Sequence, residues 1–166
     1  MRLVLVLFVF LLPVKGWGVS PDIFLHASRE SGIPVELLLA ISHVESRFNP
    51  HALNLSGRSV FPSSRVEAER MLQRSGDNVD VGLMQVNWGV WGRKLGVSKL
   101  DLLDSNLNVF LGAKILSHYV RARNDWWQGV GFYHSSTPER QREYVERVWR
   151  SYSRILSRVR GRFSQD

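Results

Sequence analysis

The sequence predicts a single all-α, mostly helical domain. Apolar residues recur at spacings of three and four along most of the chain, whereas no run of alternating apolar and polar residues marks a strand. Once an N-terminal export segment is set aside, about 150 residues remain, enough to bury a hydrophobic core. That core has to hold without disulfides, because the chain of 166 residues contains no cysteine. No internal repeat or low-complexity linker divides it.

Residues 1–18 have the form of a secretory signal peptide. Arg2 is followed by an apolar run over residues 3–12, and small residues stand at Gly16 and Gly18. The run is shorter than the roughly 20 residues that span a bilayer. We therefore expect residues 1–18 to be removed and residues 19–166 to be exported with no stable membrane span. A retained, anchor-like N-terminus is the alternative. Nucleic acid is not an expected partner of an exported domain.

The helices follow from their start and stop signals. Ser20, Pro21 and Asp22 begin a first helix over residues 21–31, and Gly32 ends it. Pro34 begins the second helix. Turn residues bound a long excursion over residues 54–81, with a short helix at 65–74, and long ordered loops are usually functional. Helical patterns return over residues 83–94, 105–123, 126–134 and 138–160.

The last of these helices carries much of the positive charge. An apolar stripe at helical spacing leaves its arginines on the outward face. The net charge of the whole chain is +7, and removal of Arg2 and Lys15 leaves +5. A solvated basic face is the simplest interpretation. The functional alternative is attraction to an anionic envelope polymer, a lipid surface or a partner protein.

Glu45 is the first candidate functional residue. It follows Leu37, Leu38 and Ile41 by eight, seven and four positions, which places it on their apolar face in a helix. Pro50 ends that helix soon afterwards, so Glu45 should lie in the last turn. Partial burial and the negative end of the helix dipole both favour a neutral carboxyl group, which a general acid requires. The alternative is an exposed glutamate at a helix end.

A second group of candidates lies in DVGLMQVNWGVWGRKLG, residues 80–96. Carboxylate and amide side chains can hydrogen-bond to sugar hydroxyl and acetamido groups, and a glycine permits close approach of the backbone. The indoles can cover the apolar faces of pyranose rings, although we expect them to be part of the core, as indoles usually are. The residues that together predict a carbohydrate-binding groove are Asp80, Gly82, Gln85, Asn87, Trp88 and Trp91.

Four motifs, in order, extend this interpretation to the whole domain. They are ESRFNPHALN at residues 45–54, DVGLMQVN at 80–87, SNLNVFLGAKIL at 105–116 and VGFYHSSTPERQREYVERV at 130–148. Together they resemble the lytic transglycosylase family of peptidoglycan-cleaving enzymes. The resemblance covers nearly all of residues 19–166. It implies a lysozyme-like fold of the goose-lysozyme type, a periplasmic location, peptidoglycan glycan strands as substrate, and no metal or organic cofactor.

The resemblance also implies roles for individual residues. Glu45 would be the catalytic acid and then the base, with Ser46 supporting it. Tyr133 would orient the substrate or Glu45 from the opposite wall of the cleft. The residues that would line the glycan cleft are Gly82, Leu83, Met84 and Gln85, and further substrate-binding or supporting positions are Asp80, Asn87, Tyr133, His134 and Tyr144.

The last motif departs from the usual family pattern. His134 stands where asparagine is usual, and Ser135 and Ser136 replace an Ala-Gly pair. We expect His134 to be a structural hydrogen-bonding residue and not a catalyst. This variant and the long excursion resemble specialised members associated with type III secretion, conjugation or pilus machines. The implied role is to open local gaps in peptidoglycan for such an envelope-spanning apparatus, whose components would then be partners.

Three functions remain open at this point. The first is a lytic transglycosylase in which Glu45 is the sole essential acid and base. The second is a muramidase, because the setting of Asp80 also resembles the segment of animal-type lysozymes that carries their second carboxylate, and water would then be the acceptor. The third is a non-catalytic glycan-binding assembly module. The cleavage products distinguish the first two, and glycan binding without turnover would favour the third.

Overall fold

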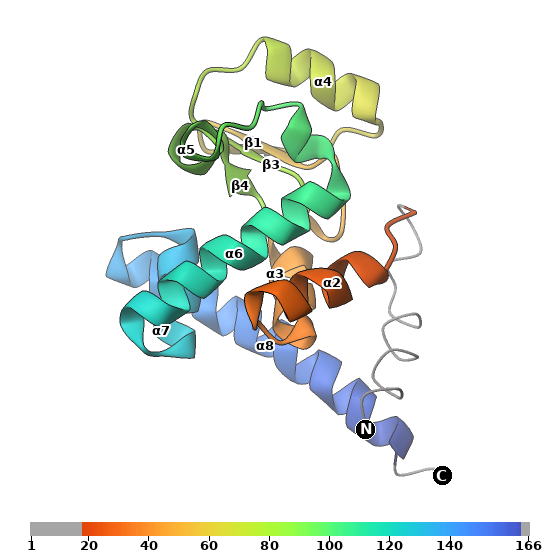
Figure 1. The fold of residues 1–166 in the computed structure, drawn as a ribbon, viewed down its shortest axis with the longest axis vertical. Helices are drawn as coiled ribbons and strands as arrows, with labels where there is room; N and C mark the ends of the chain where they lie inside the picture. The colour runs from red at the N-terminus through yellow and green to blue at the C-terminus, as the bar shows by residue number, and fades with distance from the viewer. Residues whose placement is uncertain (1–17, 164–166) are drawn as a thin grey trace.

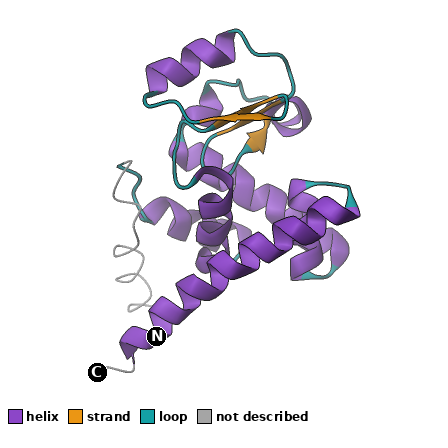
Figure 2. Cartoon of the chain, turned by 180° about the vertical axis from the view of Figure 1, so that it is seen from behind, coloured by secondary structure: helices purple, strands orange, loops and turns teal. Residues whose placement is uncertain are grey.

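The computed structural model describes residues 18–163, which form a mostly helical domain with one small sheet (Figures 1 and 2). The predicted mostly helical class is confirmed. The signal-peptide prediction, apart from Gly18, falls outside the described residues. Within residues 18–163, no helix combines the length and apolarity needed to cross a bilayer. The helices are α2 (Asp22–Ser31), α3 (Val35–Ser46), α4 (Arg65–Gln73), α5 (Arg93–Leu95), α6 (Ser105–Arg123), α7 (Trp126–His134) and α8 (Pro138–Phe163).

Capping side chains determine where several helices begin. Ser64, Asp104 and Asp125 each accept a hydrogen bond from a backbone N–H in the first turn of α4, α6 and α7. Helix α2 ends before Gly32, whose φ of 76° lies in the left-handed region. The observed α2, α6 and α7 agree with the predicted helices to within one residue, because these signals are local in the sequence.

Four short strands form an antiparallel sheet in the order β2-β1-β3-β4. Its register places Asn54 opposite both Ser59 and Asp80, and Asp80 opposite Asn87. Side chains directly opposite one another in a sheet share a face, so these four polar residues form one row. The strands are β1 (Leu53–Leu55), β2 (Arg58–Val60), β3 (Val79–Val81) and β4 (Val86–Asn87).

The sheet corrects the sequence prediction at two points. No strand was expected, and residues 83–94 were expected to be helical. Instead the chain turns at residues 82–85, forms β4, and then makes a π-helical turn, Trp88–Gly92, before α5. Strands of two or three residues contain too few positions for alternation to be visible, and they are held by partners distant in sequence.

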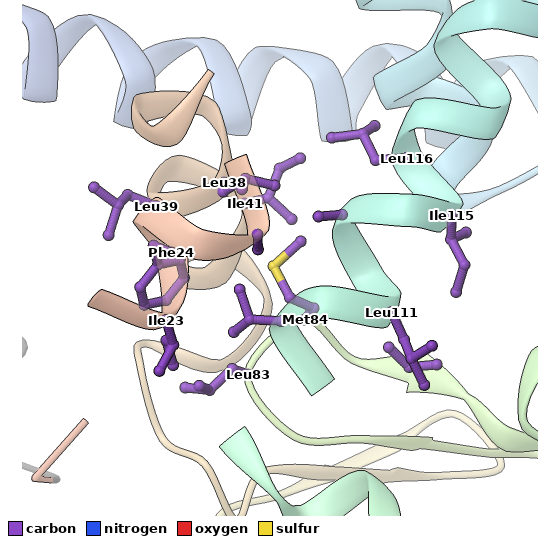
Figure 3. Close-up of a cluster of buried hydrophobic side chains, with 14 of the residues drawn as sticks. Ile23, Phe24, Leu38, Leu39, Ile41, Leu83, Met84, Leu111, Ile115 and Leu116 are labelled. Carbon is purple, nitrogen blue, oxygen red and sulfur yellow. The ribbon is translucent and has the colours of Figure 1, made fainter. Parts of the chain in front are cut away.

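The core lies where α2, α3 and α6 meet the loop between β3 and β4 (Figure 3). Phe24, Leu38, Ile41, Met84 and Leu116 are fully buried there. Helix α3 also packs along α8, and α6 packs against α2 and α7. In Figure 1 the sheet and α4 lie at one end of the molecule, α8 runs along the other, and α6 crosses between them. The end of α3 therefore reaches the junction of the two parts.

Candidate active site

A groove of about 700 Å³ lies at this junction. The polar row of the sheet forms one wall, and the end of α7 with the first half of α8 forms the other. Both ends of the long excursion, residues 54–61 and 78–80, therefore contribute to the groove that Glu45 lines. The sheet side is lined by Asn54, Gly57, Ser59, Phe61, Asn78, Asp80 and Asn87, and the aromatic part by Trp91, Tyr119, Phe132 and Tyr133.

Glu45 lies in the last turn of α3 and lines the groove, as predicted. Its side chain is 12% exposed. Leu37, Leu38 and Ile41, the residues expected on the same face, are 4%, 0% and 0% exposed. The helix ends one residue after Glu45, at Ser46, because Arg47 adopts a left-handed φ of 53°. A carboxyl group with little access to water at the base of a polar groove is well placed to exchange a proton with a bound molecule.

Ser46 connects the end of α3 to the turn between β3 and β4. Its buried hydroxyl lies 2.9 Å from the Leu83 carbonyl oxygen and 3.0 Å from that of Ser42. On the other side of the turn, the Tyr133 hydroxyl donates a hydrogen bond of 2.7 Å to the Met84 carbonyl. The residue beside Glu45 and a residue of α7 therefore hold the same short segment.

Asn108 completes this support and was not singled out from the sequence. Its side-chain N–H groups donate to the carbonyls of Val81, at 2.7 Å, and Leu102, at 2.9 Å. Its carbonyl oxygen accepts from the Met84 N–H at 2.8 Å. The sequence did contain a signal for this residue, because Asn108 lies within the third motif, residues 105–116. Only the structure shows that its amide hydrogen-bonds to the turn between β3 and β4.

Leu83 and Met84 correct the prediction that residues 82–85 all line the cleft. Both side chains are fully buried and belong to the core (Figure 3). Gly82 has a φ of 80°, and a Cβ there would stand 2.5 Å from the Asn108 Nδ2. Of the four, Gln85 lines the groove, and its amide donates 2.9 Å hydrogen bonds to the Ala52 and Gly82 carbonyls. The segment is a structural turn beside the groove.

Asp80 and Asn87 lie together on the sheet wall, as predicted for a groove. Asn87 Nδ2 donates a 2.8 Å hydrogen bond to an Asp80 carboxylate oxygen, and Asn87 Oδ1 accepts from the Val90 N–H. Burial raises the pKa of Asp80, the hydrogen bond from Asn87 opposes this rise, and the negative charge of Glu45 adds to it. The two carboxyl groups therefore influence each other within the same groove.

Tyr144 and His134 lie against Glu45 from α8 and the end of α7. Their rings are parallel, 4.2 Å apart with 3° between planes. His134 Nδ1 is 3.8 Å from Glu45 Oε1. Among residues 18–163 we find no hydrogen bond from His134, so its structural contact is stacking, not the hydrogen bond expected from the sequence.

The hydroxyl of Tyr144 is buried, and within the described part of the chain no group meets hydrogen-bond geometry with it. Burial raises the pKa of Tyr144 well above its ordinary value, and the charge of Glu45 and a hydrogen-bonding interaction with its side chain raise it further. The Glu45 carboxyl group is therefore the nearby acceptor for this hydroxyl, although the contact lies outside normal hydrogen-bond geometry. A buried polar group left in this state beside a carboxyl group is typical of a functional site.

Two tryptophans have different positions. Trp88 donates its indole N–H to the Val97 carbonyl and packs against the core, as expected. Trp91 also packs against the core, as expected, and in addition it lines the groove. It contacts Tyr119 edge to face at 6.0 Å, and Phe132 stacks on Tyr119. These rings form an apolar surface at one part of the groove.

No three His, Asp or Glu side chains within residues 18–163 are grouped to bind a metal ion.

Comparison with known proteins agrees with this geometry. The family model for the transglycosylase SLT domain matches residues 22–154. The chain is 31% identical over 141 residues to invasion protein IagB of Salmonella typhimurium, an alignment that covers 81% of this chain and 77% of the relative. It is 29% identical over 163 residues to protein IpgF of Shigella sonnei, covering 94% and 93%. No solved structure matches the chain significantly. The chain therefore belongs to the transglycosylase SLT family of lytic transglycosylases, whose lysozyme-like fold it shares.

Proposed function

We propose that this protein is a peptidoglycan lytic transglycosylase that cleaves the β-1,4 bond between N-acetylmuramic acid and N-acetylglucosamine. The observation that carries the proposal is the nearly buried carboxyl group of Glu45 at the base of a groove lined by amides and aromatic rings. Amide side chains suit the hydroxyl and acetamido groups of the sugars, and aromatic rings suit their apolar faces.

Glu45 acts twice in this reaction. The neutral carboxyl group first donates its proton to the glycosidic oxygen, and the bond from that oxygen to C1 of muramic acid breaks. The resulting carboxylate then takes the proton of the C6 hydroxyl of the same sugar, whose oxygen bonds to C1. The product ends in a 1,6-anhydro ring, Glu45 regains its proton, and no water is consumed.

The neighbouring residues position this acid. Ser46, Tyr133 and Asn108 hold the turn between β3 and β4 beside the groove, so they restrict movement of the sheet wall. Tyr144 and His134 form a stacked pair beside the carboxyl group. The buried Tyr144 hydroxyl, which lies beside Glu45, can donate a hydrogen bond to the carboxylate once Glu45 has released its proton.

Hydrolysis with Asp80 as a second carboxylate is the competing function. The position of Asp80 in the same groove favours it. Burial raises the pKa of Asp80, and the hydrogen bond from Asn87 opposes this rise. The hydrogen bond from Asn87 gives Asp80 a clear supporting role in the sheet wall.

We place this activity in the periplasm, after removal of residues 1–18, because peptidoglycan lies there. We further propose that the enzyme opens the cell wall locally for a secretion, conjugation or pilus apparatus. Two observations support this role: the variant motif at residues 133–138 and the similarity to a relative named as an invasion protein. Components of that apparatus would be partners in addition to the glycan strands.

Mass spectrometry of the muropeptides released from purified peptidoglycan tests the reaction. Products ending in anhydromuramic acid, one water lighter than reducing ends, are expected. Glu45→Gln removes the titrating proton at nearly constant shape and should abolish turnover while binding is kept. Glu36→Gln, in the first turn of the same helix and outside the groove lining, is the matched control and should remain active. Reducing ends would establish hydrolysis, and full activity of Glu45→Gln would refute the assignment.

A further inference from the structure

Three arginines line the groove around Glu45. Arg47 directly follows α3, and Arg140 and Arg147 lie on α8. Tyr144 stands between the two α8 arginines at spacings of four and three, so all three residues share one face of the helix. The guanidinium of Arg147 lies 5.5 Å from the centre of the Tyr144 ring. The three positive charges therefore line the same groove as the proposed acid.

These arginines differ from others on the same helix. Arg142 and Arg150 form ion pairs with Glu139 and Glu146, at 3.8 and 2.8 Å. In the part of the chain that the structure describes, the three groove arginines have no carboxylate within ion-pair distance. They are exposed and extend into a groove whose own carboxyl groups are Glu45 and Asp80. Their charges are thus available to an anionic ligand.

The proposed substrate offers anions at one position. The sugar rings and their acetamido groups are neutral, whereas the stem peptide carries carboxylates and is attached through the lactyl group of muramic acid. The bond that Glu45 would cleave starts at C1 of that same sugar, so its peptide must leave the strand close to Glu45. Guanidinium groups bind carboxylates through paired, charge-assisted hydrogen bonds.

We propose that Arg47, Arg140 and Arg147 form a subsite for the stem-peptide carboxylates of the muramic acid at the cleavage point. The inference rests on the proposed function and gives it a substrate preference: strands with ionised stem peptides are used in preference to strands whose peptides are neutral. Each exposed ion pair contributes up to about fivefold in affinity. Two or three such pairs therefore predict a preference of about tenfold or more.

The experiment uses the full-length protein and two forms of one substrate. Soluble, uncross-linked peptidoglycan strands are compared with the same strands after their carboxylates have been converted to amides with carbodiimide and ammonia. The readout is the ratio of kcat/KM on native strands to kcat/KM on amidated strands. We expect a ratio of about ten for the wild type, falling to at most about five in Arg140→Gln/Arg147→Gln, which keeps Arg47, and to about one when Arg47→Gln is added. Arg142→Gln/Arg150→Gln, with the same loss of charge from α8, should keep the wild-type ratio.

A binding measurement separates this inference from the proposed reaction. Glu45→Gln should bind native strands about tenfold more tightly than amidated strands. If the wild type releases no product but this difference in binding is found, the reaction is wrong and the subsite stands. If anhydro products form and the ratio is one for all variants, the reaction stands and the subsite is overturned. Thermal melts of the two double variants, both altered at exposed positions, show whether folding is kept.

Discussion

Replacement of Asn108 by alanine tests the central structural argument, that α6 holds the turn beside the groove. The Asn108 side chain is 1% exposed and makes three hydrogen bonds, of 2.7, 2.8 and 2.9 Å, to backbone groups of other segments. A buried hydrogen bond contributes a net stabilisation of about 1 kcal/mol, and a partner left unsatisfied costs about 1–3 kcal/mol. Water can enter the space left by the amide and limit the loss.

The expected loss in the free energy of unfolding for Asn108→Ala is therefore about 3–5 kcal/mol. For a domain of this size that corresponds to a fall in Tm of about 10 °C. Urea unfolding gives the free energy and a thermal melt gives Tm. Turnover of peptidoglycan should fall as well, because the turn beside the groove, which connects to Ser46, is no longer held in place.

Asn106→Ala is the matched control, since Asn106 lies two positions earlier on α6 and is exposed. It should cost less than about 0.5 kcal/mol. A loss below about 1 kcal/mol for Asn108→Ala, close to that of the control, would refute the reasoning, because it would mean that the turn is stable without the three hydrogen bonds.

Three further predictions concern the groove. Gly82→Ala should destabilise the fold by about 2 kcal/mol or more, because the φ of 80° disfavours alanine and the new Cβ would stand 2.5 Å from Asn108. Urea unfolding measures this loss, and unchanged stability would contradict the close approach. Asp80→Asn should gain stability relative to the wild type as pH rises. Burial raises the pKa of Asp80 above its ordinary value of 3.8, so the free energy of unfolding of the wild type falls as the pH rises above about 4, whereas asparagine does not titrate. A difference in unfolding free energy between the two proteins that does not vary with pH would refute this. Tyr144→Phe should leave the unfolding free energy within about 1 kcal/mol of the wild type, because the lost hydroxyl has no partner of normal hydrogen-bond geometry in residues 18–163. Turnover of peptidoglycan should fall about tenfold. A strongly destabilised variant would show that the hydroxyl is structural.

Local signals were sufficient to predict much of the fold and part of the site. Caps, prolines and glycines act on their own neighbours, so α2, α6 and α7 could be placed from the sequence. The position of Glu45 in the last turn of a buried helix also followed from spacing alone. The sheet could not be predicted, because its two- and three-residue strands are defined by pairing across the chain.

The second motif, residues 80–87, was likewise only partly predictable from the sequence. The sequence indicated that residues 80–87 belong to the site, but it did not distinguish side chains that face the groove from those that face the core. Gln85 and Asp80 line the groove, whereas Leu83 and Met84 are buried. The turn reverses the direction of the chain within four residues, and the direction of each side chain then depends on Asn108 and Tyr133, which lie on other helices.

The sequence by itself therefore determined the helical class, the family motifs and the choice of Glu45 as the proposed acid, because each depends on residue types at fixed short spacings. Only the tertiary structure decided which residues surround that acid. The approach of α8 to the end of α3 brings Tyr144, His134 and the two groove arginines of α8 into the groove that holds Glu45, although they are about 90 or more positions away along the chain. Such neighbours result from packing of whole elements, and no local pattern in the sequence records which elements will meet.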